Sequence, residues 1–195
     1  MRYNHFIEEE TVMKVKFGVK EVVAVGIGSA LFVALTQVQI PLGIPNTALQ
    51  PRAALLAFLS AVFGPVVGAA VGLIGHALGD MFFYGSAWWS WVFPEAIFAI
   101  VVGAFANKYG VKEGAFGKKE IILFNIMQVI GNAAAWILAA PVLDILIYKE
   151  PAQKVFIQGV GAWLGNVLII AVLGTLLTVG YAKVGAKSSS LTKED

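Results

Sequence analysis

Long apolar runs alternate with short polar breaks along this chain, and the pattern predicts membrane-spanning helices. About 20 apolar residues in a helix cross a hydrocarbon core of about 30 Å. Hydrophobic residues make up 58% of the chain, more than a soluble core of this size could bury. We therefore expect an all-α, polytopic membrane protein. Its six transmembrane helices should lie at about residues 22–40, 53–63, 66–84, 92–107, 121–140 and 153–181.

Positive charges lie mainly on one side of this arrangement. Six crossings put both termini on the same side, and that side collects eleven of the fourteen lysine and arginine residues. Only Arg52, Lys149 and Lys154 lie opposite. By the positive-inside rule both termini are then cytoplasmic. The expected outer loops lie near residues 41–52, 85–91 and 141–152. The expected regions are a cytoplasmic segment at 1–20, a membrane domain at 21–183 and a cytoplasmic tail at 184–195.

Motifs for common enzyme chemistries are missing from the sequence. The chain has no cysteine, which excludes disulfides, thiolate catalysis and cysteine-ligated metals. It also lacks a GxxxxGK[ST] phosphate loop, an HExxH zinc motif and a GxSxG elbow. His76 is a poor metal ligand without others at helical spacing. We expect no enzyme, no cofactor and no bound metal, so binding of a small molecule remains.

The stretch GHALGDMFFYGSAWWSWVFPE, residues 75–95, gathers polar and aromatic groups inside the apolar pattern. His76, Asp80 and Tyr84 follow one another at i, i+4 and i+8, on one helix face. A turn carries the chain into the next helix, where Glu95 follows. An intramembrane carboxylate costs about 2.5 kcal/mol or more unless it is paired or solvated, so Asp80 and Glu95 demand an explanation.

Depth along the helices, at about 1.5 Å per residue, places most of the intramembrane polar groups in the outer half of the bundle. Such a pocket suits a compact polar heterocycle, whose ring would stack on tryptophan and whose edge would bond amides. Asp80 and Glu95 would share a proton, so that one donates to the ligand and the other accepts. The candidate ligand-binding residues are Asn46, His76, Asp80, Tyr84, Trp88, Trp89, Glu95, Gln128, Asn132, Trp136 and Gln158.

Each of these signals has a simpler structural explanation. Buried amides such as Asn125 and Asn166 often join membrane helices, and tryptophans near residues 88–91 can form an interfacial belt. His76 can be a hydrogen-bonded core histidine. The two carboxylates can be structural partners of Arg52 or of this histidine.

Two further features predict surfaces. Gly26, Ala30 and Ala34 recur every fourth residue and form a small-residue stripe, which lets another helix approach closely. We expect this stripe to dock a partner subunit. The loop from Pro41 to Pro51 contains three prolines, which reduce its conformational freedom, and we expect it to act as a lid over the pocket. A dense series of glycines from Gly64 to Gly79 predicts close packing of the third helix.

The chain resembles the S component, the substrate-binding membrane subunit, of an energy-coupling factor (ECF) vitamin transporter. The resemblance covers about residues 20–185 and rests on AVGIGSALFVAL, IPNTALQPRAALLAFLSAVFGPVVGAAVGLIGHALGD and YGSAWWSWVF. These are similar to a sub-group of riboflavin-type S components, one member type of which is proposed to carry hydroxymethylpyrimidine or pyridoxine. Ala30 and Ala34 match the AxxxA contact motif of the family. The resemblance implies a transmembrane coupling subunit, two ATPases and toppling of the S component in the membrane of a prokaryotic cell.

Two other classes stay open. In an autonomous proton-coupled secondary transporter, His76, Asp80 and Glu95 would relay protons. The two halves of the chain have unlike loop lengths and show no inverted repeat, which argues against this class. In a ligand-free assembly subunit, the polar residues should be scattered in depth rather than collected.

Overall fold

The computed structural model describes residues 18–191, with side chains over residues 18–185. The predictions for residues 1–17 and 192–195 lie outside the described residues. The chain order is α1 (Val19–Leu35), β1 (Ile40–Pro41), β2 (Ala48–Leu49), α2 (Pro51–Phe63), α3 (Pro65–Tyr84), α4 (Trp89–Gly103), α5 (Ala106–Tyr109), α6 (Lys118–Asn132), η1 (Ala133–Ala139), α7 (Ala140–Leu143), η2 (Asp144–Tyr148), α8 (Ala152–Ile169), η3 (Ile170–Gly174) and α9 (Thr175–Leu191). The three segments η1, η2 and η3 are π-helical.

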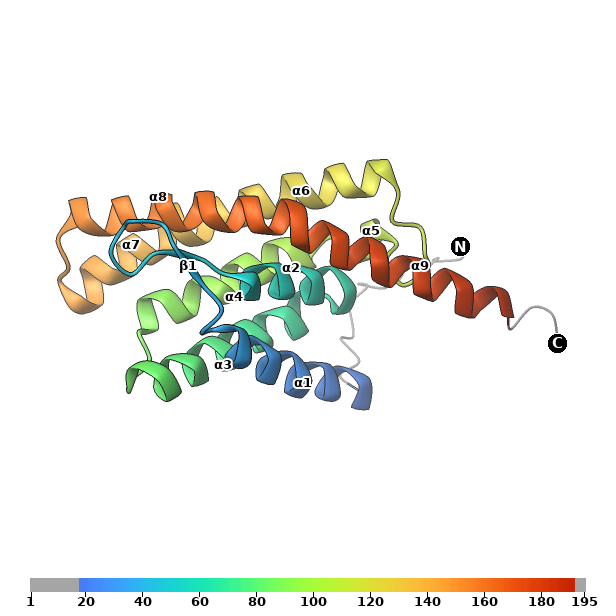
Figure 1. Ribbon diagram of the computed structural model, residues 1–195, viewed down its shortest axis with the longest axis horizontal. Helices are drawn as coiled ribbons and strands as arrows, with labels where there is room; N and C mark the ends of the chain where they lie inside the picture. The colour runs from blue at the N-terminus through green and yellow to red at the C-terminus, as the bar shows by residue number, and fades with distance from the viewer. Residues whose placement is uncertain (1–17, 192–195) are drawn as a thin grey trace, which may run out of the picture.

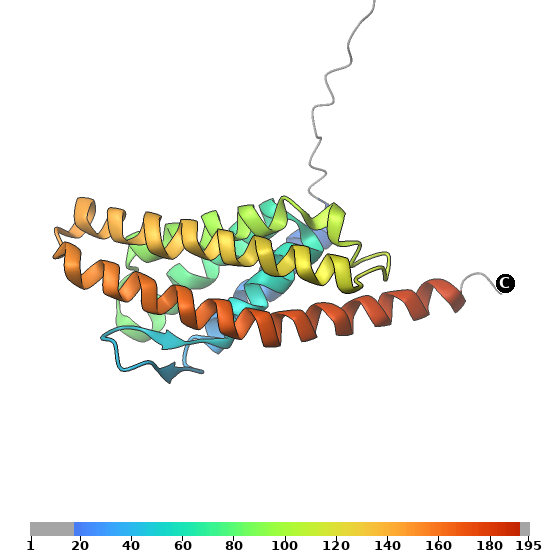
Figure 2. The same cartoon turned by 90° about the horizontal axis from the view of Figure 1, so that it is seen from above.

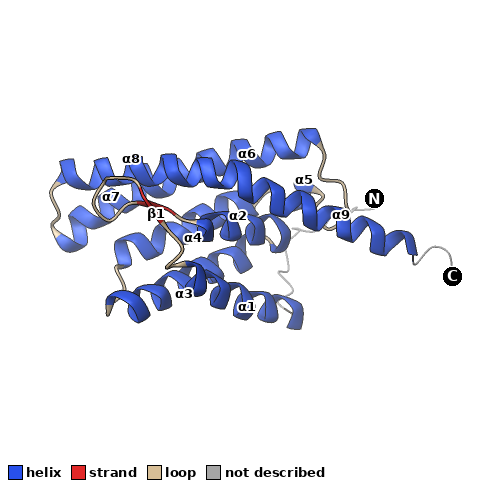
Figure 3. Cartoon of the chain, viewed as in Figure 1, coloured by secondary structure: helices blue, strands red, loops and turns tan. Residues whose placement is uncertain are grey.

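Helices dominate the described chain, as the apolar runs predict (Figure 3). Two long helical rods, one from α6 to η2 and one from α8 to α9, run side by side along the bundle, and α1 to α4 pack beneath them (Figures 1 and 2). Three described helices are long and apolar enough to cross a membrane: Pro65–Tyr84, Lys118–Tyr148 and Ala152–Gly185.

The exterior of the bundle carries many exposed apolar side chains, and the interior holds polar groups beside an apolar core. Along the rod from α8 through η3 to α9, Leu168, Val172 and Leu176 are each more than 60% exposed. His76, Asp80 and Glu95 are buried instead. An apolar exterior with these polar groups kept inside fits a helical protein whose outer surface contacts lipid, because lipid cannot hydrogen-bond polar groups.

Close packing of α3 confirms the prediction from its glycines. A methyl group built on Gly75 would lie 2.8 Å from Phe32 in α1, and one on Gly79 would lie 2.7 Å from Thr36 Oγ1. On another face, Gly68 lies against Ser60 of α2, and Gly72 lies against Glu95 of α4. Only glycine lets α3 approach all three neighbouring helices this closely.

The loop after α1 forms a short antiparallel hairpin, which the sequence pattern did not predict. Ile40 pairs with Leu49, and Pro41 pairs with Ala48. The hairpin packs on the glycine face of α8, where a methyl group on Gly161 would lie 2.6 Å from Ile44. The expected lid is therefore a folded ribbon seated on α8. One end of the bundle holds residues 36–50, the α3–α4 connection and the η2–α8 turn (Figure 1). We call it the hairpin end.

Several predicted helix boundaries are wrong, and one of them changes the site. The fifth helix does not end at Ala140 but continues through Pro141 to Tyr148. Proline clashes with a carbonyl one regular turn earlier, and the wider π-helical turn before it relieves this clash. Asp144, assigned to a loop from the sequence, is therefore helical and buried.

The remaining boundary errors are smaller. The first helix ends at Leu35, because the following residues join the hairpin. The fourth runs from Trp89 to Gly103 rather than over 92–107. The sixth begins at Ala152 and continues to Leu191 as one rod that includes η3.

Candidate ligand-binding site

A cavity of about 640 Å³ lies at the hairpin end. Its walls come from the hairpin, the start of α2, the last turns of α3, the α3–α4 connection, η2 and the first turns of α8. Small-molecule sites typically have about 300–1,000 Å³. A smaller cavity of about 60 Å³ shares Arg52, Trp91 and part of the hairpin with it, and adds Glu95 and Trp136. The two spaces together form one polar region inside the bundle.

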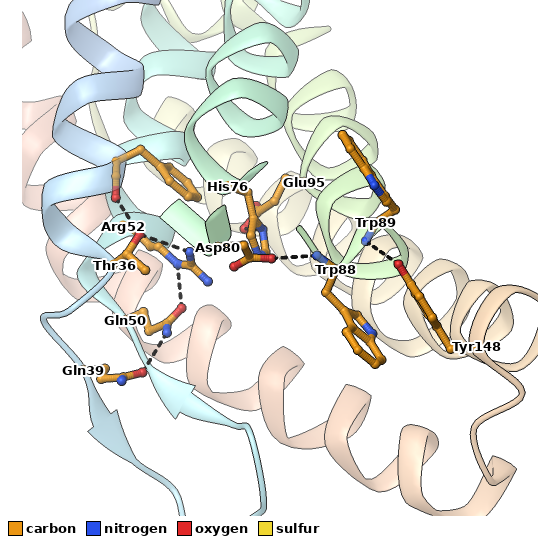
Figure 4. A network of polar contacts seen from close by, with 11 residues as sticks. Thr36, Gln39, Gln50, Arg52, His76, Asp80, Trp88, Trp89, Glu95 and Tyr148 are labelled. Atoms are coloured by element: carbon orange, nitrogen blue, oxygen red, sulfur yellow. Dashed lines mark hydrogen bonds and ion pairs between the residues drawn. The ribbon is translucent and has the colours of Figure 1, made fainter. Parts of the chain in front are cut away.

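His76 stands between the two intramembrane carboxylates (Figure 4). Its Nε2 lies 3.5 Å from Asp80 Oδ1, one turn later on α3. Its Nδ1 lies 3.3 Å from Glu95 Oε1 on α4, although it makes no aligned hydrogen bond. Predicted spacing therefore gave the correct His76–Asp80 pair, and the fold adds Glu95 to it. Asp80 also accepts the backbone N–H of Trp88 at 3.0 Å.

Arg52 is the cation nearest to this group. It follows Pro51 at the start of α2 and is 9% exposed. Its Nε donates to Gln50 at 2.6 Å, and one terminal nitrogen donates to Thr36 Oγ1 at 3.4 Å. The guanidinium also lies 5.0 Å from the ring centre of Phe32 and points toward Asp80 (Figure 4). Within the described residues Arg52 forms no ion pair, so of the two structural partners expected for the carboxylates, His76 lies within ion-pair distance of both and Arg52 of neither.

Asp144 organises the aromatic wall of the cavity. Its carboxylate accepts the indole N–H of Trp88 at 2.7 Å, the indole N–H of Trp91 at 2.7 Å and the hydroxyl of Ser90. Trp88 also stacks on Tyr148, with ring centres 4.1 Å apart. Asp144 therefore fixes Trp88 of the α3–α4 connection and the first turn of α4 against the start of η2.

The predicted site residues divide into three groups. The large cavity is lined by Asn46, His76, Asp80, Tyr84, Trp88 and Gln158. The small cavity is lined by Asn46, Glu95 and Trp136. Trp89, Gln128 and Asn132 line neither cavity.

The third group is used between helices or at the surface. Gln128 is buried and donates to the carbonyl of Val167 on α8 at 3.4 Å. Asn132 donates to Gln128 Oε1 at 3.1 Å and to its carbonyl at 2.9 Å. Trp89 is 42% exposed and stacks on Phe93. The spacing of Gln128 and Asn132 correctly placed them on one face of α6, but that face meets α8 rather than a cavity. Trp89 faces the outside. We therefore leave these three residues out of the site.

Sequence reasoning missed several lining residues. Arg52 and Trp91 line both cavities but are not among the residues predicted for the site. Asp144 is missed because Pro141, three residues before it, predicts the end of the helix and places Asp144 in a loop. Asn166 lines the small cavity rather than joining helices, whereas Asn125 does join helices through Thr175. Gln39 and Gln50, which bond each other at 3.0 Å, carried no spacing signal.

The small-residue stripe of α1 faces away from the rest of the described chain. Gly26, Ala30 and Ala34 are all exposed, and a methyl group on Gly26 would meet nothing within 4 Å. Larger apolar side chains flank the stripe, with Ile27 58% exposed. The opposite face of α1, with Gly28 and Phe32, packs into the bundle.

This architecture belongs to the class of helical membrane proteins with a polar cavity of small-molecule size. Residues 16–183 match the family model of the ECF-type riboflavin transporter, S component. The chain is 50% identical to a UPF0397 protein of Enterococcus faecalis over 93% of this chain and 100% of that protein. It is 49% identical to one of Streptococcus gordonii, over 91% and 96%, and 46% identical to one of Clostridium perfringens, over 93% and 98%.

The chain therefore belongs to the ECF-type riboflavin transporter S-component family. No solved structure matches it. S components are substrate-binding membrane subunits for vitamin-type molecules, and they work with a T component and ATPases rather than as enzymes. The resemblance seen in the sequence is thus confirmed at the level of the family.

Proposed function

We propose that this chain captures a small vitamin or vitamin precursor outside a prokaryotic cell and delivers it inward with a transmembrane coupling subunit and two ATP-binding subunits. Hydroxymethylpyrimidine, pyridoxine or a similar heterocycle is the proposed substrate. The observation that carries the proposal is the cavity at the hairpin end, with buried His76 and Asp80 on one wall and Arg52 on another. Family membership supports the division of labour with partner subunits.

The proposed topology has six spans with both termini in the cytoplasm. The start of α1 and the end of α9 lie at the same end of the bundle, opposite the hairpin end, which supports this arrangement (Figure 1). The cavity then opens outward, where an imported ligand arrives. Lysines carried on the linker 108–119 would lie on the cytoplasmic side, as the positive-inside rule requires.

In this proposal Asp80 and Glu95 bind the ligand, and the hairpin covers it. Gln158 of α8 donates to the carbonyl of Pro45 at 2.8 Å, which holds the hairpin in place beside the cavity. Asn46 has a positive φ of 56° at the tip of the hairpin, a conformation that asparagine adopts more readily than most residues.

Retained ligand and transport together test this function. The purified chain should release a small heterocycle on denaturation, identified by mass spectrometry, and the ATPases should co-purify after mild extraction. Proteoliposomes with the full complex should transport the labelled molecule only when ATP is present on the side of the membrane where the ATPases lie. Chain that carries no ligand and has no partners would overturn the proposal.

The Gly26, Ala30 and Ala34 stripe is proposed to dock the coupling subunit. Replacing Ala34 with tryptophan should lower uptake by the full complex about tenfold or more, because a bulky side chain separates helices that rely on close approach. Ligand affinity of the isolated chain should stay unchanged, since Ala34 is exposed and lines neither cavity. Leu164→Trp on the exposed face of α8 is the matched control. Full uptake by the Ala34→Trp complex would contradict the assignment.

A second candidate is an autonomous proton-coupled transporter, favoured by the histidine that lies between two carboxylates. Uptake by the isolated chain in proteoliposomes, driven by a pH gradient without ATP, would support it over the coupled importer.

A further inference from the structure

Glu95 is a buried carboxylate without a hydrogen-bond donor in the described chain. Its side chain is 6% exposed, and its one close polar neighbour is His76 Nδ1 at 3.3 Å, which makes no hydrogen bond. A buried charge left without partners is costly, so such a group is retained where something else compensates it. Glu95 lines the small cavity, where a donor on a bound molecule can reach it.

His76 cannot satisfy both of its neighbours. A neutral imidazole carries one N–H, whereas Asp80 and Glu95 face opposite ring nitrogens. Asp80 has the backbone N–H of Trp88 in addition, and Glu95 has no such second donor. The Nδ1 atom of His76, in a side chain only 5% exposed, also lacks a hydrogen-bond partner, and it faces the Glu95 carboxylate.

The charges that line the two cavities do not balance. Glu150 is paired with Lys154 at 2.7 Å, and Asp144 is saturated by two indoles and a hydroxyl. With every carboxylate ionised and His76 neutral, Asp80, Glu95 and Asp144 stand against Arg52, two negative charges in excess, because the donors on Asp144 are themselves neutral. A cavity with low-dielectric walls concentrates such a field and selects ligands of opposite charge.

Arg52 adds a second requirement. Gln50 and Thr36 occupy its Nε and one terminal nitrogen, and the other donors remain directed toward the cavity (Figure 4). It can therefore donate to a neutral acceptor, such as a hydroxyl or carbonyl oxygen, on the same ligand. A phosphate group would bring at least one further negative charge beside Asp80 and Glu95, which a single guanidinium does not offset.

Resting on the proposed function, we infer that the substrate is a cationic nitrogen heterocycle in its free, unphosphorylated form. Its protonated amino or ring nitrogen contacts Glu95 and Asp80, and an oxygen acceptor contacts Arg52. Trp91 and Trp136, with ring centres 5.4 Å apart beside the small cavity, provide the apolar wall for the ring. Anionic forms of the same ring are rejected.

Matched ligand series test this inference on the full-length chain in lipid nanodiscs. One series is pyridoxamine, pyridoxine and pyridoxine phosphate; the other is 4-amino-5-hydroxymethyl-2-methylpyrimidine, its 4-oxo counterpart and its phosphate. Riboflavin serves as a neutral probe of different shape. In the series that binds, calorimetry should give the protonatable amine at least tenfold higher affinity than the neutral member, and no measurable binding of the phosphate.

The variant Glu95→Gln separates the charge from the shape of the pocket. It should lower affinity for the amine about tenfold or more and change affinity for the neutral member less than twofold. Glu113→Gln is the matched control, because its carboxylate is exposed and lines neither cavity. It should change both affinities less than twofold.

Failure of the inference and failure of the function look different. If the neutral or phosphorylated member or riboflavin binds best, or Glu95→Gln leaves amine binding unchanged, the inference is wrong while the chain remains a substrate-binding subunit. If no probe binds, the charge of the molecule that co-purifies decides, and a neutral or anionic molecule overturns the inference. If nothing binds and nothing co-purifies, the proposed function fails with it.

Discussion

Asp144 and Glu95 are both buried carboxylates beside the same polar region, but their surroundings are opposite. Asp144 accepts hydrogen bonds from Trp88, Ser90 and Trp91, whereas Glu95 accepts none within the described residues. A saturated carboxylate holds the protein together, because its charge is compensated by fixed donors. An unsaturated one is available to a ligand. The difference separates a residue that positions the site from one that binds.

The largest effect should come from Asp144→Asn. The amide nitrogen of the new asparagine would face an indole or hydroxyl group that is also a donor. Each buried donor left unpaired in this way costs about 1–3 kcal/mol. We expect the free energy of unfolding to fall by about 3 kcal/mol, or the melting temperature by about 6 °C, measured on ligand-free protein. An unchanged melting temperature would mean that the three hydrogen bonds do not fix this region.

A smaller loss should follow Trp91→Phe, which removes one donor from Asp144 Oδ2 and keeps the aromatic wall. A hydrogen bond to a charged group is worth about 1.5–3 kcal/mol, so we expect a loss near the lower figure. Trp163→Phe is the control, because its indole N–H makes a longer bond of 3.3 Å to a backbone carbonyl. Equal melting temperatures for the two variants would count against a special role for the Asp144 cluster.

Glu95→Gln, the same chemical change as in Asp144→Asn, should have the opposite sign. It removes a buried charge that has no fixed donor, so the ligand-free protein should gain about 1 kcal/mol of stability. Thermal unfolding without ligand measures this. A loss comparable to that of Asp144→Asn would make Glu95 a structural residue like Asp144.

The smallest effect concerns motion. Saturating ligand should slow amide hydrogen exchange in the hairpin at residues 41–51, which lines the cavity. Exchange at Trp88, Trp89 and Trp91 should change little, because their backbone N–H groups are already hydrogen-bonded within the protein. Equal exchange in the hairpin with and without ligand would remove its role as a lid.

Much of the fold could be predicted because it depends on local patterns. Apolar runs predicted the helices, and the glycines of α3 predicted close packing, which the structure shows against α1, α2 and α4. The spacing of His76 and Asp80 gave their pairing within one helix. These features need no knowledge of which helix lies beside which.

The rest of the site depends on tertiary contacts. Asp144 meets Trp88 and Trp91 across more than 50 residues of chain, which no spacing rule reveals. Gln128 and Asn132 share one face of α6, but the sequence does not say that this face meets α8 rather than the cavity. Pro141 reads as a helix end because the wide turn that accommodates it has no clear sequence signal.

A high-resolution structure of the chain with the ligand that it retains tests the central claim most directly. The account predicts a ligand nitrogen within hydrogen-bond distance of Glu95, with Asp144 still bonded to both indoles. A ligand that leaves Glu95 without a contact, or that takes Asp144 away from Trp88 and Trp91, would contradict it.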